Sequence, residues 1–351
     1  MRNMIKPLRN SSIELFRVLA TFLVLIVHFN AWMLGGMPET FDGTHLSLFS
    51  IGQVVIESLS IVCVNCFLII SGYYGITFKY RTIWNIFVLL VSIYVPFYLF
   101  ECIYKDAFSL KELMSCCLAL SRKNYFVQCY LILCFLSPVL NAYIDKNGTR
   151  ILNFVLLFWG IEFYFDCLRN NVTLGFDNGY SLIHFILMYF LGRTVFIYRD
   201  TILSIHKGYY IVGYIVCVLI VSILYVVGID WAYDYSNPII IIEAFCLFIP
   251  FLYYSYHKRW INWIASSTFA VYIIHMNGIQ CRYLCYVDNY LLCSYSYLIY
   301  LLIGSIVIIL TFIFCIMYDK LRITLTVRFT DKLYQFLEMK YLKLKTILTK
   351  E

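Results

Sequence analysis

Long apolar segments, separated by short polar stretches, make up most of the chain. Each segment is near the length of about 20 mostly apolar residues that a helix needs to cross a bilayer. We predict ten spans, at residues 12–34, 47–74, 82–104, 125–143, 150–168, 180–198, 208–228, 237–256, 262–286 and 293–318. The pattern therefore predicts an all-α, polytopic membrane bundle, with residues 1–318 as its membrane domain.

The composition supports this class. The 351 residues are 62% hydrophobic and only 13% charged, with a mean hydropathy of +0.80. A soluble domain has about 25% charged residues, so we exclude a soluble enzyme. In such a chain the net charge of +7 is not a nucleic-acid signature, and we expect no nucleic-acid partner. Most of the 14 cysteines fall in apolar runs without a paired Cys-x-x-Cys set, so we expect no metal site.

The basic residues predict the orientation. If the N-terminus is cytoplasmic, 20 Lys and Arg fall in inner segments and 6 in outer segments, which favours two cytoplasmic ends. Residues 319–351 follow the last span as a tail. Its apolar side chains recur every three to four residues, with lysines between them, at Leu333, Leu337, Tyr341, Leu344 and Leu348. This spacing predicts a basic amphipathic helix that contacts membrane lipid on the inner leaflet.

The first span carries two basic side chains, Arg17 and His28. At 100° per residue their spacing closes to about 20°, so they share one helix face, separated by about 16 Å of rise. A charged residue in a span costs about 2.5–3.5 kcal/mol, so it usually faces a protein interior, a cavity or a partner. Glu14, one turn before Arg17, is a candidate partner. The alternative is that Arg17 reaches the headgroups and His28 is a satisfied polar residue in the bundle.

Other polar side chains lie inside later spans. His184 and His275 join His28 as intramembrane histidines, and histidine is well suited to take a hydroxyl proton near neutral pH. Glu162 and Asp166 lie one turn apart, where two carboxylates can share a proton. A hydrated helix end is the commoner interpretation of such a pair.

Three phrases of the sequence resemble one family. The first is IELFRVLATFLVLIVHF, which holds Arg17 and His28. The second is the Phe-containing helix end at Ser71, Gly72 and Tyr73, and the third is Tyr-x-x-His at Tyr272 and His275. Together they resemble the acyltransferase 3 family of bacterial membrane enzymes, over residues 10–320. That family transfers acyl groups, commonly acetyl from acetyl-CoA, to sugars of surface polysaccharides.

The resemblance implies a multi-pass O-acetyltransferase of the bacterial inner membrane. Its donor substrate is acetyl-CoA or another acyl-CoA, its acceptor is a lipid-linked or surface polysaccharide, and we expect no tightly bound cofactor. Acyl transfer needs a base or an acyl-carrying nucleophile, and coenzyme A phosphates need positive charge. We therefore expect Arg17 to bind acyl-CoA and His28 to be the base or a transient acyl carrier. Further phosphate contacts are expected at Lys79, Arg81 and Arg193. Supporting or acceptor-binding roles are expected at Glu14, Ser71, His184, Tyr272 and His275.

Two other classes stay open. A transporter or lipid-linked sugar flippase would also place polar groups in a cavity, and it predicts helices interrupted by Gly or Pro in matched halves. The prolines of the spans lie singly or towards helix ends, and we see no such pairing. A non-enzymatic membrane partner would tolerate loss of His28. Binding of coenzyme A distinguishes an acyltransferase from a flippase.

Overall fold

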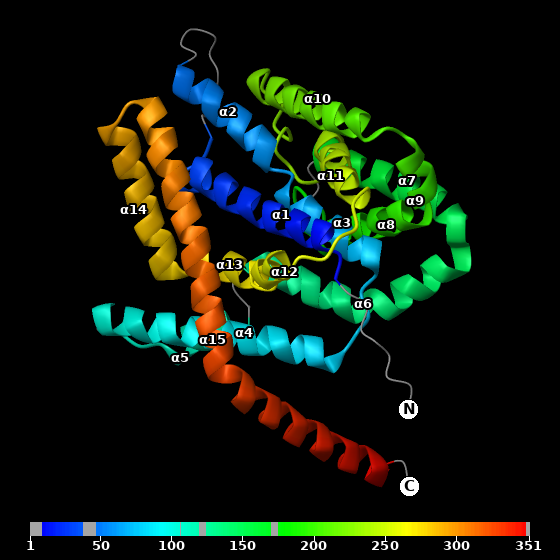
Figure 1. Ribbon diagram of the computed structural model, residues 1–351, viewed down its shortest axis with the longest axis vertical. Helices are drawn as coiled ribbons and strands as arrows, with labels where there is room; N and C mark the ends of the chain where they lie inside the picture. The colour runs from blue at the N-terminus through cyan, green and yellow to red at the C-terminus, as the bar shows by residue number, and fades with distance from the viewer. Residues whose placement is uncertain (1–8, 38–46, 106, 119–123, 170–174, 349–351) are drawn as a thin grey trace.

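The computed structural model describes residues 9–37, 47–105, 107–118, 124–169 and 175–348, and every regular element in these ranges is helical (Figure 1). The all-α class is therefore confirmed. Six helical stretches are long and apolar enough to cross a membrane, and two shorter apolar helices accompany them. The exact count of ten spans is not confirmed, because some predicted spans are broken or joined to a neighbour.

The elements follow one another along the chain as α-helices joined by short 3-10 or π turns. The first half contains α1 (Ser11–Asn30), η1 (Trp32–Leu34), α2 (Leu48–Ser60), α3 (Cys63–Tyr74), α4 (Tyr80–Lys105), α5 (Leu110–Cys117), α6 (Tyr125–Asn147), η3 (Gly148–Arg150), α7 (Ile151–Glu162) and η4 (Phe163–Leu168). The second half contains α8 (Leu182–Ile197), α9 (Arg199–Ser204), α10 (Lys207–Val226), α11 (Pro238–Leu252), α12 (Arg259–Ala265), α13 (Thr268–His275), α14 (Gly278–Ser294) and α15 (Tyr297–Leu348).

Helix α1 lies at the centre of the bundle and contacts α2, α3, α11, α12, α13, α14 and α15 (Figure 1). It begins where the side chain of Asn10 accepts a hydrogen bond from the backbone N–H of Ser12 (3.1 Å), which satisfies one of the free donors of the first turn. The buried face of α1 includes Phe16, Ala20 and Val24. Because other helices surround α1, its polar side chains meet protein rather than lipid.

Helices α3 and α8 approach closely through two glycines. A Cβ atom at Gly72 would overlap the backbone oxygen of Tyr189, and a Cβ atom at Gly192 would overlap the backbone oxygen of Ile69. Small residues allow such contact between backbones in membrane bundles. This packing fixes the last turn of α3, which carries Ser71.

The prediction of one continuous helix over residues 262–286 is wrong, because this stretch forms parts of α12, α13 and α14. At the first break the Ser266 hydroxyl donates to the backbone oxygen of Trp263 (2.8 Å), and Thr268 donates to Ala265 (2.9 Å). Such hydroxyls compete with the helical hydrogen bonds of the backbone. The second predicted span is also interrupted, between α2 and α3.

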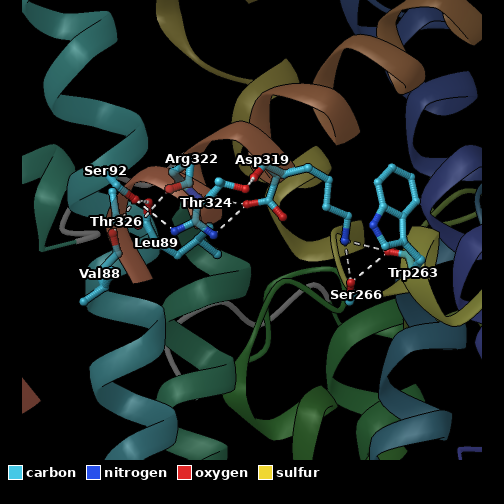
Figure 2. Close-up of polar contacts among 10 residues, drawn as sticks. Val88, Leu89, Ser92, Trp263, Ser266, Asp319, Arg322, Thr324 and Thr326 are labelled. Atoms are coloured by element: carbon cyan, nitrogen blue, oxygen red, sulfur yellow. Dashed lines mark hydrogen bonds and ion pairs between the residues drawn. The ribbon is translucent and has the colours of Figure 1, made fainter. Parts of the chain in front are cut away.

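Helix α15 continues without a break past residue 319, where the tail was predicted to begin. Figure 2 shows how this part is attached. The Arg322 guanidinium pairs with Asp319 (2.6 Å) and donates to the hydroxyl of Ser92 in α4 (3.2 Å). The ammonium of Lys320 donates to the Trp263 backbone oxygen and to the Ser266 hydroxyl, both at 2.6 Å. Helix α15 therefore holds the break between α12 and α13. The domain boundary and the contact of the tail with lipid stay predictions.

Candidate active site

A cavity of about 970 Å³ follows α1, and its lining extends from Arg9, before the helix, to Gly36, after it. At the first end the Ser11 hydroxyl donates to Oδ1 of Asn262 in α12 (2.8 Å). At the second end Nε2 of Gln53 in α2 donates to the backbone oxygen of Asn30 (2.8 Å). We call these the Arg17 end and the Trp32 end, after lining residues near each.

Arg17 lines the cavity and has a side chain that is 30% exposed. Its Nη1 atom lies 2.7 Å from Oε2 of Glu14, so the ion pair that the spacing indicates is present. A guanidinium carries five N–H donors, and this pair uses only Nη1. The remaining donors leave Arg17 able to bind an anionic group in the cavity.

His28 lines the same cavity, eleven residues further along α1. Its Nδ1 atom lies 2.7 Å from Nε2 of His275 in α13. Nδ1 of His275 in turn lies 2.7 Å from the backbone oxygen of Val271, which can only accept. Nδ1 of His275 is therefore the protonated nitrogen, and Nε2 of a neutral His275 accepts from Nδ1–H of His28. This arrangement leaves Nε2 of His28 with a free lone pair.

Aromatic rings surround the two histidines. The ring of Trp32 lies 6.3 Å from the ring of His28, and the ring of Tyr272 lies 6.2 Å from that of His275. Trp32 and Tyr272 both line the cavity, as does Ser71, whereas His275 is fully buried behind His28. The structure thus brings four of the residues singled out in the sequence to one wall or to its immediate support.

The structure does not bring Lys79, Arg81 or Arg193 into the lining of the cavity. Arg81 pairs with Asp331 of α15, and its guanidinium lies over the ring of Tyr334. Arg193 donates to the backbone oxygen of Tyr73 (3.3 Å). The contact of these three residues with coenzyme A phosphates stays a prediction without geometric support.

His184 does not line the cavity either, and its side chain is fully buried. Its Nδ1 lies 3.1 Å from Oε1 of Glu162, and its Nε2 lies 2.8 Å from Oδ1 of Asn65. The amide of Asn65 then donates to the backbone oxygen of Tyr235, which lines the cavity (2.9 Å). His184 therefore supports one wall of the cavity from behind.

The interpretation of Glu162 and Asp166 as a hydrated helix end is wrong, because their exposed fractions are 0% and 2%. Asp166 accepts from the backbone N–H groups of Asn178 (2.7 Å) and Gly179 (3.0 Å). Asn178 has a φ of 53°, a left-handed conformation that asparagine tolerates better than most residues. This carboxylate thus shapes the loop that places Asn178 in the cavity wall.

Two carboxylates of the cavity were not singled out in the sequence. Glu57 of α2 is 4% exposed and accepts at Oε2 from the amide of Asn30 (2.9 Å). Asp234 lies between α10 and α11, and burial together with neighbouring aspartates raises the pKa of its carboxyl to about 7. An isolated carboxylate carries no sequence signal of this kind, since only the folded chain brings these side chains to the cavity.

The order of groups along the cavity defines its chemistry. A guanidinium lies near one end, an imidazole lone pair follows about 16 Å further along the helix, and carboxylates lie near the other end. Such a cavity can bind a long ligand with an anionic group at one end and present its other end to a base.

Comparison with known proteins gives the class of this chemistry. No curated protein matches the chain, and no solved structure matches it. A family model described as an acyltransferase domain matches residues 10–319, which include the whole lining of the cavity. The chain therefore belongs to the acyltransferase 3 family and is a membrane acyltransferase.

Proposed function

We propose that the protein moves an acyl group, most simply acetyl, from acyl-CoA to a hydroxyl of a lipid-linked or cell-surface polysaccharide. The observation that supports this proposal is that Arg17 and His28 line one continuous cavity. Acyl-CoA carries phosphates at one end and its thioester at the other. The offset of about 16 Å along α1 suits a ligand of this form, with phosphates at the Arg17 end and the thioester near His28.

In the proposed reaction, Nε2 of His28 accepts the proton of the acceptor hydroxyl while the hydroxyl oxygen attacks the thioester carbonyl carbon. The carbon–sulfur bond then breaks, and the sulfur of coenzyme A takes the proton from Nε2. The products are an O-acyl sugar and the thiol of coenzyme A. His275 keeps Nδ1–H of His28 in place and so orients the reacting nitrogen.

A variant of this route uses the same lone pair as a nucleophile. Nε2 of His28 then attacks the thioester, carries the acyl group, and passes it to the hydroxyl in a second step. In both routes acyl-CoA enters from the Arg17 end and the acceptor from the Trp32 end. With both termini in the cytoplasm of a bacterial cell, as we propose, the Arg17 end faces the cytoplasm.

One observation favours the flippase as a second candidate. Helix breaks lie beside the cavity, at Ile61 between α2 and α3 and at Ser266 between α12 and α13, and both residues line it. Transporters place interrupted helices at their substrate sites. These breaks lack Gly and Pro, and membership of the acyltransferase 3 family favours acyl transfer.

The test uses membranes that contain the protein, its native glycan and radiolabelled acetyl-CoA. We expect label in an alkali-labile ester of the glycan, and competition by unlabelled coenzyme A. A flippase would instead move lipid-linked sugar across vesicles without binding coenzyme A. Sugar movement without coenzyme A binding and without ester formation would reject the proposal.

A further inference from the structure

The two ends of the cavity carry opposite charges. Among the described residues of its lining, the side chains that are charged at neutral pH, histidine apart, are Arg9, Arg17, Glu57 and Asp234. The two arginines belong to the first turns of α1 and the stretch before it. Glu57 bonds to Asn30 in the last turn of α1, so the carboxylate lies at the Trp32 end. The proposed donor accounts for the arginines but not for the carboxylates.

Glu57 is held in place by two helices and retains an acceptor for a ligand. Its Oε2 accepts from Asn30 of α1, whose amide also donates to the backbone oxygen of Gln53 (2.9 Å). No hydrogen bond reaches Oε1 from any part of the chain that the structure describes. Since Glu57 lines the cavity while only 4% of it is exposed, this oxygen is available to a bound hydroxyl.

Asp234 is positioned by its neighbours rather than by its own carboxylate. The backbone N–H of Tyr235 donates to the oxygen of Asn178 (3.1 Å), and the amide of Asn237 donates to the oxygen of Ala232 (2.8 Å). Within the described ranges the carboxylate itself accepts no hydrogen bond. It lines the cavity and is free to accept from a ligand.

Aromatic rings fill the space between these carboxylates. The rings of Tyr125 and Tyr180 lie 4.9 Å apart, and those of Tyr180 and Tyr235 lie 5.0 Å apart. Flat apolar rings pack against the C–H face of a sugar, while carboxylate oxygens accept from its hydroxyls. Two carboxylates in a shared low-dielectric site repel a further negative charge.

We propose that the Trp32 end, with Glu57 and Asp234, is the acceptor subsite, and that it takes a sugar unit that carries no anionic group. This inference rests on the proposed function and names the class of its acceptor. The carboxylates bind the hydroxyls of the sugar and hold one of them towards Nε2 of His28. An acidic sugar, such as a uronate, is rejected by charge.

The test uses purified full-length protein, radiolabelled acetyl-CoA and paired acceptor analogues. The pairs are para-nitrophenyl glucoside with its glucuronide, and galactoside with its galacturonide, which differ only in a CH2OH or carboxylate group. We expect the neutral member of a pair to be labelled at least about tenfold faster. Equal or faster labelling of the acidic members would overturn the inference.

Two variants locate the discrimination. Glu57→Gln keeps an oxygen for Asn30, and Asp234→Asn keeps the size of the side chain. Each should raise the KM of the neutral acceptor by about tenfold and narrow the preference for it, without changing the Kd of coenzyme A. Asp288→Asn is the control, because Asp288 is fully buried, binds Tyr300 and does not line the cavity. An unchanged KM and preference in both cavity variants would overturn the inference.

The outcomes also separate this inference from the proposed function. If wild type neither binds coenzyme A nor forms any ester, the proposed function fails and the inference fails with it. If coenzyme A binds but only acidic sugars are labelled, or no sugar of either kind is, the acceptor subsite alone is rejected.

Discussion

Nδ1 of His28 and Nε2 of His275 lie 2.7 Å apart, although 247 residues separate them along the chain. The contact joins α1 to α13, and Val271 fixes the far nitrogen of His275. In the sequence these histidines were separate candidates, one ranked for chemistry and one for acceptor positioning. Their contact makes His275 a positioning residue for His28, since it acts on the ring that faces the cavity.

Replacement of His275 tests this positioning role. His275→Ala should lower kcat by about 100-fold or more, because the ring of His28 loses its orientation, and should leave the KM of acyl-CoA near the wild-type value. His275→Gln should recover part of the rate, since its amide oxygen can accept from Nδ1–H of His28. Steady-state kinetics of matched amounts of protein provide the measurement. Equal rates for wild type and His275→Ala would exclude the role.

Replacement of Arg17 tests donor binding. Arg17→Ala should weaken coenzyme A binding by about tenfold or more, because a charge-assisted contact to phosphate is lost. Arg322→Ala is the control, since Arg322 also pairs with an acidic residue three positions away but does not line the cavity. It should lower thermal stability, because Asp319 is 1% exposed and loses its partner, without changing the Kd. Similar Kd values for all three proteins would contradict the assignment of Arg17.

The close packing of α3 on α8 predicts a sharp difference between glycines. Gly72→Ala and Gly192→Ala should each reduce the amount of folded protein in the membrane, because a Cβ atom at either position meets the backbone of the other helix. Gly160→Ala in α7 should be neutral or slightly stabilising, since no atom lies within 4 Å of its Cβ position. Thermal denaturation of the extracted proteins gives the comparison. A Gly72→Ala protein as stable as Gly160→Ala would show that the helices separate without cost.

The buried pair of His184 and Glu162 predicts strong coupling in stability. Both side chains are fully buried and lie 3.1 Å apart. Removal of one partner of such a pair costs about 3–5 kcal/mol, so His184→Ala should markedly lower the melting temperature. Adding Glu162→Gln should recover part of the loss, because no charge is then left unpaired. If the two changes were simply additive, the pair would not act as a unit.

Asp234 predicts a pH dependence of acceptor choice. The carboxyl is mostly neutral below its pKa of about 7 and charged above it, because burial and then the charges of Asp166, Asp230 and Asp177 disfavour the anion. Tyr180, Tyr235 and Glu57 also line this end of the cavity. The ratio of kcat/KM for neutral over acidic acceptors should therefore rise between about pH 6 and about pH 8.

The ratio compares two acceptors at the same pH, so the protonation of His28 cancels from it. Asp234→Asn should remove most of the rise, while the control Asp288→Asn should keep it. A ratio that stays constant with pH in the wild type would count against a charged Asp234 near the acceptor.

The parts of the fold that depend on local pattern were predictable. Apolar segment length predicted the all-α membrane class, and helical spacing placed Arg17 and His28 on one face. Both residues line the same cavity in the structure. Glu14 pairs with Arg17 because the two lie one turn apart on a helix, which is also a local relationship. Their catalytic and binding roles stay predictions.

The parts that depend on tertiary contacts were not predictable. The partners of His184 and His275 come from distant segments, and nothing in the spacing of Glu57 or Asp234 places them beside a cavity. The break at Ser266 was missed because its hydrophobic run reads as one span. Hydroxyl bonds to the backbone and the contact from Lys320 decide that local structure.

The central claim is that Nε2 of His28 carries out acyl transfer. The most direct test compares wild type, His28→Ala and the control His206→Ala, which changes an exposed histidine that caps α10. Membranes matched for protein amount receive radiolabelled acetyl-CoA, and label in glycan ester is followed. The account predicts transfer by wild type and His206→Ala, and a loss of about 100-fold or more in His28→Ala with coenzyme A binding retained. Equal transfer by His28→Ala and wild type would contradict it.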